Sequence, residues 1–223
     1  MYTKIKGTHL SSGKMAQLLT EWSYTTPAAV CAQKLHLNRN TVDLWYRRIQ
    51  ECILHLPPPL PFTGVVEIDE CYFGNKPFGM KGTGMIGKVP VFGIRSRETG
   101  RVWTTTMSGV ITQTNIIPVI QKMIIHGSTI YSDGFGVYAP LQSLGYKHHV
   151  VYHAHTFVTS RMIHTNGIES FWRYLRHFFR SKRTLSRNLY EPYLKEAVFR
   201  FNTRSPEKLR KVVRKMLKST LKI

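Results

Sequence analysis

The stretch Gly64-Val-Val-Glu-Ile-Asp-Glu-Cys-Tyr-Phe-Gly74 constrains the fold of this chain more than any other. Its β-branched and aromatic residues, bounded by glycine at both ends, predict a β-strand. Asp69 lies in the middle of it, although aspartate is depleted in strands. The chain has three aspartates: Asp43 falls in a helical pattern, and Asp133 ends a second strand-like run, Thr-Ile-Tyr-Ser-Asp. Two scarce aspartates in apolar strands favour a metal-dependent site, with a solvated acid on an edge strand as the alternative.

The charge balance indicates a polyanionic partner. The chain has 32 Lys and Arg against 12 Asp and Glu, a formal net charge of +20, which favours double-stranded DNA. A membrane is not expected, because there is no run of 18 apolar residues and the N-terminal stretch lacks the apolar segment of a signal peptide. Cys31, Cys52 and Cys71 form no C-x-x-C pair, which favours buried thiols in a reducing cytoplasm over disulfides or a zinc site.

Residues 1–58 are expected to form a helix-turn-helix DNA-binding domain. The apolar spacing predicts helices over 14–22, 28–35 and from Asn38 or Asn40 to 53, and a plain three-helix packing unit is the alternative. The third helix would offer polar side chains to DNA, among them Arg39, Asn40, Arg47 and Arg48. The proline-rich residues 55–62 are expected to be a stiff linker.

Residues 63–204 are expected to form the second domain. Its predicted elements are strands 65–73, 89–95, 101–107, 129–132 and 149–152, and helices 114–126, 137–144 and 166–180. This order is that of the RNase H-like fold, an α/β class in which helices flank a mixed sheet. Lys76 and Lys81, in the loop after the first strand, are expected to touch the DNA backbone. Residues 205–223 predict a separate basic amphipathic helix, either a DNA clamp or a dimer contact.

The late helix is predicted to combine an acid with several cations. Spacings of three and four residues put Asn166, Glu169, Arg173 and Arg176 on one face, opposite an apolar face. Among the nearby histidines, at 148, 149, 153 and 155, packing and phosphate contacts are favoured over zinc. His153 is retained as a possible neighbour of the acids, because its strand should run beside them.

Several motifs together carry a family resemblance. They are Glu67-Ile-Asp-Glu-Cys-Tyr-Phe-Gly74, Tyr131-Ser-Asp-Gly134, Gly145-Tyr-Lys-His148 with Val151-Tyr-His153, His164-Thr-Asn-Gly-Ile-Glu-Ser-Phe-Trp172 and Phe199-Arg-Phe-Asn202. In this order, over roughly residues 64–204, they resemble the ISXO-like insertion-sequence transposases of the DDE class. The interval of 35 residues between Asp133 and Glu169 also matches that class.

The resemblance implies a function and a site. Asp69, Asp133 and Glu169 would be the acids that hold two Mg²⁺ ions, with Mn²⁺ as a substitute and Asp69 bridging the pair. The reaction would be cleavage at the element's ends, followed by attack of the freed 3′-hydroxyl on target DNA. The partners would be terminal inverted repeats, target DNA and further copies of the chain, as a homodimer or higher synaptic oligomer. The location would be the cytoplasm of a prokaryote, on DNA.

Some points stay open at this stage. No paired cysteines form the zinc ribbon that such proteins often carry, so no zinc is expected, and Arg176 stands where the family usually has lysine. Asn166 is an alternative third ligand, although the charge of two divalent cations favours Glu169. The alternative functions are a catalytically inert DNA-binding protein derived from a transposase and a structure-specific nuclease of the same fold.

Overall fold

The computed structural model describes residues 8–74, 88–151, 165–180 and 189–220. The chain forms two compact units, residues 58–198 and residues 1–57 together with 199–223. We call the first the sheet unit and the second the helical unit. The sequence treated residues 205–223 as a separate segment, whereas the structure joins them to the N-terminal helices. No described helix is long and apolar enough to cross a membrane.

The helical unit contains the three helices that the sequence predicts. They are α1 (Ser12–Ser23), α2 (Ala28–Leu35) and α3 (Arg39–Leu54), and α7 (Pro206–Thr220) joins them. Asn38 caps α3, because its side chain accepts a 2.8 Å hydrogen bond from the backbone N–H of Asn40. Helix α2 ends at His36 in the left-handed conformation, which makes the turn to α3 tight.

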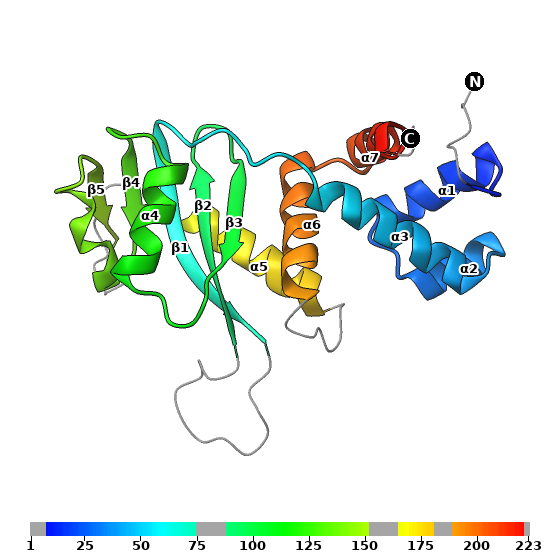
Figure 1. The fold of residues 1–223 in the computed structure, drawn as a ribbon, viewed down its shortest axis with the longest axis horizontal. Helices are drawn as coiled ribbons and strands as arrows, with labels where there is room; N and C mark the ends of the chain where they lie inside the picture. Colours follow the sequence, from blue (N-terminus) through cyan, green and yellow to red (C-terminus); the bar gives the residue numbers. More distant parts are fainter. Residues whose placement is uncertain (1–7, 75–87, 152–164, 181–188, 221–223) are drawn as a thin grey trace, which may run out of the picture. The chain divides into compact units, whose positions relative to one another are not determined.

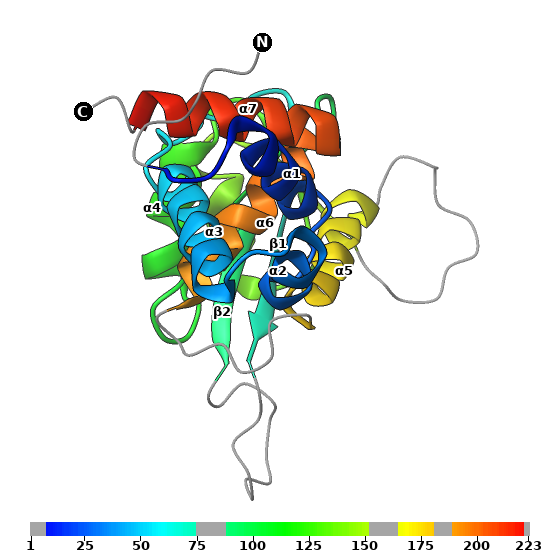
Figure 2. The same ribbon diagram turned by 90° about the vertical axis from the view of Figure 1, so that its right-hand side faces the viewer.

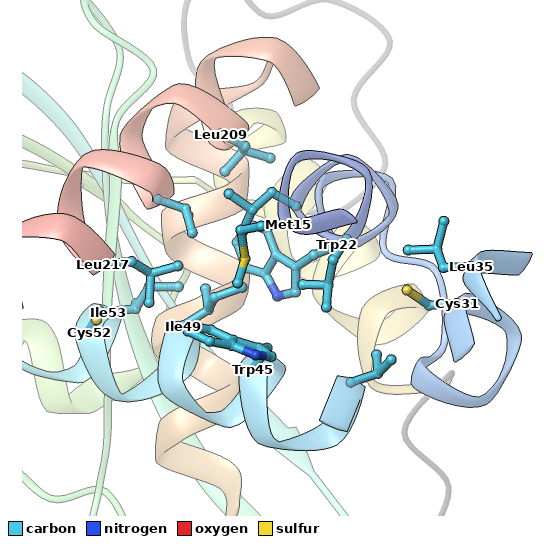
Figure 3. Close-up of a cluster of buried hydrophobic side chains, with 14 of the residues drawn as sticks. Met15, Trp22, Cys31, Leu35, Trp45, Ile49, Cys52, Ile53, Leu209 and Leu217 are labelled. Atoms are coloured by element: carbon cyan, nitrogen blue, oxygen red, sulfur yellow. The ribbon is translucent and has the colours of Figure 1, made fainter. Parts of the chain in front are cut away.

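The core of the helical unit is closed by α7. Figure 3 shows Trp22, Trp45 and Ile49 gathered with side chains from the C-terminal helix. The side chains of Leu209, Val213 and Leu217 are all buried in this core, and Figure 2 shows α7 lying over α1. The three N-terminal helices therefore do not complete their own core, and a fragment ending at residue 58 would leave its apolar surface in water.

A further contact comes from the end of α6 (Tyr190–Thr203), a helix that the sequence did not predict. Arg200 is 6% exposed; its guanidinium lies 3.6 Å from the centre of the Trp22 ring and donates a 2.9 Å hydrogen bond to the Trp22 carbonyl. It thus adds a second hydrogen bond to a carbonyl at the end of α1 that already accepts one from the backbone N–H of Thr25. The arginine of the Phe-Arg-Phe-Asn motif is a structural residue.

The sheet unit is built on five strands. They are β1 (Val65–Phe73), β2 (Val89–Ser96), β3 (Val102–Thr106), β4 (Thr129–Ser132) and β5 (Lys147–Val150). The order across the sheet is β3-β2-β1-β4-β5, with β1 to β3 antiparallel and β4 and β5 parallel to β1. The chain has the predicted RNase H-like fold, with β1 at the centre of the sheet.

Helices lie on both sides of this sheet. Figure 1 shows α4 (Gln113–Met123) in front of the strands and α5 (Asn166–Arg180) behind them. One predicted helix was wrong: in place of an α-helix over 137–144 the structure has a 3₁₀-helix at Gly136–Leu141, the helix type that short connecting segments often adopt. The last predicted strand also begins earlier, at Lys147.

Candidate active site

Asp69 lies at the centre of the sheet and faces α5. Its carboxylate accepts hydrogen bonds from the backbone N–H of Glu70 at 2.8 Å and from the indole Nε1 of Trp172 at 2.9 Å. Gly93 is its neighbour on β2, and a Cβ there would lie 2.7 Å from the Trp172 ring. Glycine at this position therefore lets the helix approach closely enough for the indole to reach Asp69.

The other two acids come from different elements. Asp133 directly follows β4, the strand parallel to β1, and accepts a 3.0 Å hydrogen bond from the backbone N–H of Phe135. Glu169 lies in the first turn of α5. Both are half-buried, as Asp69 is. The three carboxylates thus come from a central strand, the end of a neighbouring strand and a helix start.

The electrostatics couple these three groups. Burial raises the pKa of Asp69 to about 6, against the two hydrogen bonds that lower it, and the charges of Asp133 and Glu169 raise it further. Like charges that repel one another disfavour the ionised form, and a cation between them would remove that cost. A cation bound near Asp69 would therefore favour its ionised form.

The carboxylates are near one another but do not form a finished metal site. Among the residues that the structure describes, no three His, Cys, Asp or Glu side chains form a group that could hold a metal ion. The donor set nevertheless fits Mg²⁺, which prefers carboxylate oxygens and retains several waters. The two oxygens of Asp69 are already oriented by hydrogen bonds from two sides.

Glu70 contributes a further acid that the sequence did not assign. It lies on the other face of β1, where it accepts a hydrogen bond from the hydroxyl of buried Tyr138. Burial raises the pKa of Glu70 to about 7, and the charges of Asp133 and Asp69 add to the rise. The alternation of side chains along a strand accounts for its place opposite Asp69, but no sequence signal connects it with Tyr138.

The predicted faces of α5 are confirmed. Asn166, Arg173 and Arg176 are exposed and Glu169 is half-buried, whereas the apolar residues between them are buried. Arg176 donates a 3.2 Å hydrogen bond to the Sγ atom of Cys71 on β1. The helix therefore presents one acid, an amide and guanidinium groups away from the core.

Two of the predicted histidines pack within the sheet. The Nε2 atom of His148 lies 2.8 Å from the Ser132 hydroxyl, and burial lowers the pKa of His148. His149 stacks on Tyr131, with ring centres 5.1 Å apart. His153, Lys76 and Lys81 lie outside the described residues.

The predicted DNA-facing side chains of α3 lie on its surface. Arg39, Asn40 and Arg47 are exposed. Arg48 is half-buried, with its guanidinium 4.8 Å from the centre of the Trp45 ring. Arg39 is 3.5 Å from Asp43 in an exposed pair. Exposed pairs of this kind are weak, so the guanidinium of Arg39 can be turned toward another anion at little cost.

Residues 61–202 match the model of the ISXO2-like transposase domain. The chain belongs to this family. The match covers the sheet unit and most of α6, close to the predicted domain of residues 63–204.

Two curated relatives are transposase-like as well. An "uncharacterized transposase-like protein" of Haemophilus influenzae is 25% identical over 121 residues, which are 54% of this chain and 97% of that protein. An "uncharacterized protein in transposable element ISH50" of Halobacterium salinarum is 28% identical over 167 residues, 67% of this chain. The alignment spans 56% of that second relative's length.

Solved structures with a related arrangement are integrase and transposase proteins. The catalytic core of HTLV-2 integrase matches with a TM-score of 0.38 and 11% identity, covering 63% of this chain and 84% of that one. The BIV integrase core gives a TM-score of 0.37 and 10% identity, with coverages of 64% and 82%. The Mos1 transpososome gives 0.37 and 12%, with coverages of 99% and 82%.

Proposed function

We propose that this transposase-family chain cuts DNA at the ends of an insertion sequence and joins the freed 3′-hydroxyl to target DNA. The observation that carries the proposal is the position of Asp69 on the central strand, within range of the charges of Asp133 and Glu169, which come from two other elements of the sheet unit. Membership of the ISXO2-like family supports the same reaction.

In this proposal the three acids hold two Mg²⁺ ions, which Mn²⁺ can replace, and no zinc takes part. Asp69 would contact both ions, and Asp133 and Glu169 would each contact one. The bound metal pair would activate the attacking oxygen and offset the negative charge that grows on the phosphate. The Trp172 indole N–H keeps one Asp69 oxygen oriented, which fixes the side chain before DNA arrives.

The helical unit would bind the ends of the element. Residues 1–57 and 199–223 contain 16 Lys and Arg against four Asp and Glu, a net charge of +12 on 82 residues. Exposed Arg39, Asn40 and Arg47 on α3 would contact base edges, and the cations of α7 would contact phosphates. Arg48 would add a contact at the edge of that surface. In the sheet unit, Arg173 and Arg176, with Lys76 and Lys81, would contact DNA phosphates.

Further copies of the chain would be partners, because two element ends must be cut and joined together. We propose a homodimer or higher synaptic oligomer on double-stranded DNA in a prokaryotic cytoplasm. The terminal inverted repeats would be the specific site, and target DNA would be bound by charge.

The experiment uses the full chain and duplexes that carry the inverted repeats flanking its gene. With Mg²⁺, labelled repeat ends should be cut to a 3′-hydroxyl and then joined to a supercoiled target plasmid. Cleavage of branched DNA without joining would favour the structure-specific nuclease. Repeat binding with no cleavage in either Mg²⁺ or Mn²⁺ would favour the inert DNA-binding protein. Each outcome selects one of the three functions.

A further inference from the structure

Glu67 is a second acid on the α5-facing side of β1, two residues before Asp69. It is 1% exposed, and both of its oxygens have partners. One accepts a 2.9 Å hydrogen bond from Nε of Arg97, and the other accepts a 2.7 Å hydrogen bond from the backbone N–H of Ile168. Arg95 lies 3.6 Å from the second oxygen.

The bond to Ile168 fixes the start of α5. The first four N–H groups of a helix have no partner within it, and a carboxylate at that end is also favoured by the helix dipole. Glu67 supplies this partner from a central strand rather than from the chain before the helix. The helix start is therefore tied directly to the sheet.

A second hydrogen bond holds α5 to β1 one turn later. Trp172 donates its indole N–H to Asp69, so Ile168 and Trp172 are held by Glu67 and Asp69 respectively. Four helical residues advance about 6 Å, and two strand residues advance about 6.6 Å. These two lengths nearly match, so the two carboxylates set where α5 lies along β1. Glu169 lies between the two tied positions.

The approach of α5 to this point requires glycine. A Cβ at Gly167 would lie 2.0 Å from Nη1 of Arg95 and 2.6 Å from Oε2 of Glu67. Both distances are far below van der Waals contact, so a side chain there would displace the Arg95 guanidinium and the Glu67 carboxylate, or the helix start itself. The lack of space for a side chain at Gly167 is thus independent evidence that the start of α5 lies close to Glu67.

One arginine partner of Glu67 also contacts a third strand of the sheet. The guanidinium of Arg97 lies 3.8 Å from the centre of the Tyr131 ring on β4, the strand that leads to Asp133. Tyr131 is also the register partner of Glu67 in the parallel pair. One buried cluster therefore connects the elements that carry all three proposed metal ligands.

We propose that Glu67 is a positioning residue: it holds the first turn of α5 so that Glu169 faces Asp69 and Asp133 and can share a metal ion with them. This rests on the proposed function. Glu67 itself does not serve as a ligand, because its two oxygens are occupied by Arg97 and Ile168. Loss of residues that orient metal ligands typically lowers metal affinity by about 10- to 100-fold.

The test compares Glu67→Gln with wild type in the full chain, without DNA. Glutamine has one acceptor oxygen, so it cannot accept from Arg97 and Ile168 together. Hydrogen exchange of the Ile168 amide should become about tenfold faster or more. The apparent affinity for Mn²⁺, measured by the rise in Tm on titration with MnCl₂, should fall by about 10- to 100-fold. Glu98→Gln removes an exposed carboxylate of the same unit and should change neither readout.

A second variant tests the same proposal in case Glu67→Gln does not fold. Gly167→Ala changes no charge but disturbs the contact between the helix start and the Glu67 carboxylate, and it should also weaken Mn²⁺ binding by about tenfold or more. Gly136→Ala is its matched control, because a Cβ at Gly136 meets no atom within 4 Å.

The outcomes separate this proposal from the proposed function. Faster exchange at Ile168 with unchanged Mn²⁺ affinity would overturn the positioning role and leave Glu67 a structural residue. Unchanged exchange in both variants would overturn it as well. If wild-type protein shows no response to Mn²⁺, the metal site of the proposed function fails and the positioning role falls with it, whereas the exchange result still reports whether the helix tie exists.

Discussion

The two units of this protein use charge in opposite ways. In the helical unit the acids are few and cations cover the surface of an apolar core, as Lys211, Lys215 and Arg47 illustrate. In the sheet unit the decisive charges are buried or half-buried, and each has a specific partner, as Glu67, Asp69 and Glu70 do. Exposed charges attract a partner by their sum, and salt screens that attraction. The effect of a buried charge depends instead on the distance and direction of its specific partner. We therefore expect single substitutions to be severe in the sheet unit and gradual on the surface of the helical unit.

The largest effect should come from Asp69→Asn. The amide has nearly the same shape, and its one oxygen can still accept the Trp172 hydrogen bond although not the Glu70 bond as well, but it removes one negative charge from the proposed metal ligands. Single-turnover cleavage of a repeat-end duplex should fall by roughly a thousandfold or more, because the metal pair supplies most of the stabilisation of the transition state. Affinity for the same duplex, measured by fluorescence anisotropy, should stay within about threefold. A cleavage rate within about tenfold of wild type would contradict the proposal that Asp69 is needed for cleavage and not for DNA binding.

Next in size is the comparison of Glu169→Gln with Asn166→Ala. Glu169 acts electrostatically on Asp69, whereas Asn166 is exposed at the helix start. We expect Glu169→Gln to slow single-turnover cleavage by about a hundredfold or more, and Asn166→Ala by less than about tenfold. A pre-nicked repeat substrate isolates the joining step for both variants. The reverse order of effects would make Asn166 the third ligand and Glu169 a partner of neighbouring cations.

In the helical unit the apolar core should matter more than any one surface cation. Val213 on α7 is fully buried, whereas the adjacent Val212 is 40% exposed, so the two positions form a matched pair. Val213→Ala should lower the free energy of unfolding by about 2 kcal/mol, and Val212→Ala by less than about 0.5 kcal/mol. Urea unfolding followed by tryptophan fluorescence measures both. Equal effects would mean that α7 does not belong to this core.

A pH dependence should follow from the raised pKa of Asp69. The pKa in the folded protein, about 6, lies above the usual 3.8, so the ionised carboxylate costs stability above pH 6. That cost decreases as the pH falls from 6 to 3.8 and is absent below that range. In EDTA, Asp69→Asn should therefore raise the Tm at pH 8 and change it little at pH 4, with a stabilisation of at most about 3 kcal/mol. A stabilisation that is the same at both pH values would contradict a charge effect.

The smallest effect should come from a surface cation of the helical unit. Lys215 is exposed on α7, and its replacement by alanine should remove about one phosphate contact. The slope of log affinity against log salt should fall by about 0.9, with equal loss for repeat and random duplexes. Arg47→Ala on α3 should instead weaken repeat binding more than random binding. If the two variants behave alike, α3 does not read sequence.

The sequence predicted most of the local structure. Strand β1 and helices α2 and α5 occupy the predicted residues, because apolar periodicity and boundary glycines act over short distances. The 3₁₀-helix around Pro140 was missed, since an apolar run of that length fits either helix type. Helix α6 was missed as an element, although its Phe-Arg-Phe-Asn motif was recognised.

The site was predictable in composition more than in arrangement. The scarcity of aspartate indicated Asp69 and Asp133, and the periodicity of α5 put Glu169 on the exposed face. The bonds from Trp172 to Asp69, from Tyr138 to Glu70 and from Ile168 to Glu67 join residues 68 to 103 positions apart. No local pattern specifies such pairs, because they depend on where the whole helix meets the sheet. The closure of the N-terminal core by α7 was missed for the same reason.

The most direct measurement is X-ray diffraction from crystals of the full chain grown with MnCl₂, with data collected at the manganese absorption edge. The account predicts anomalous peaks within coordination distance of oxygens of Asp69, with Asp133 and Glu169 completing the ligands. Peaks held by other residues, or the absence of any peak at Asp69 at saturating Mn²⁺, would contradict the claim that these three acids form one metal site.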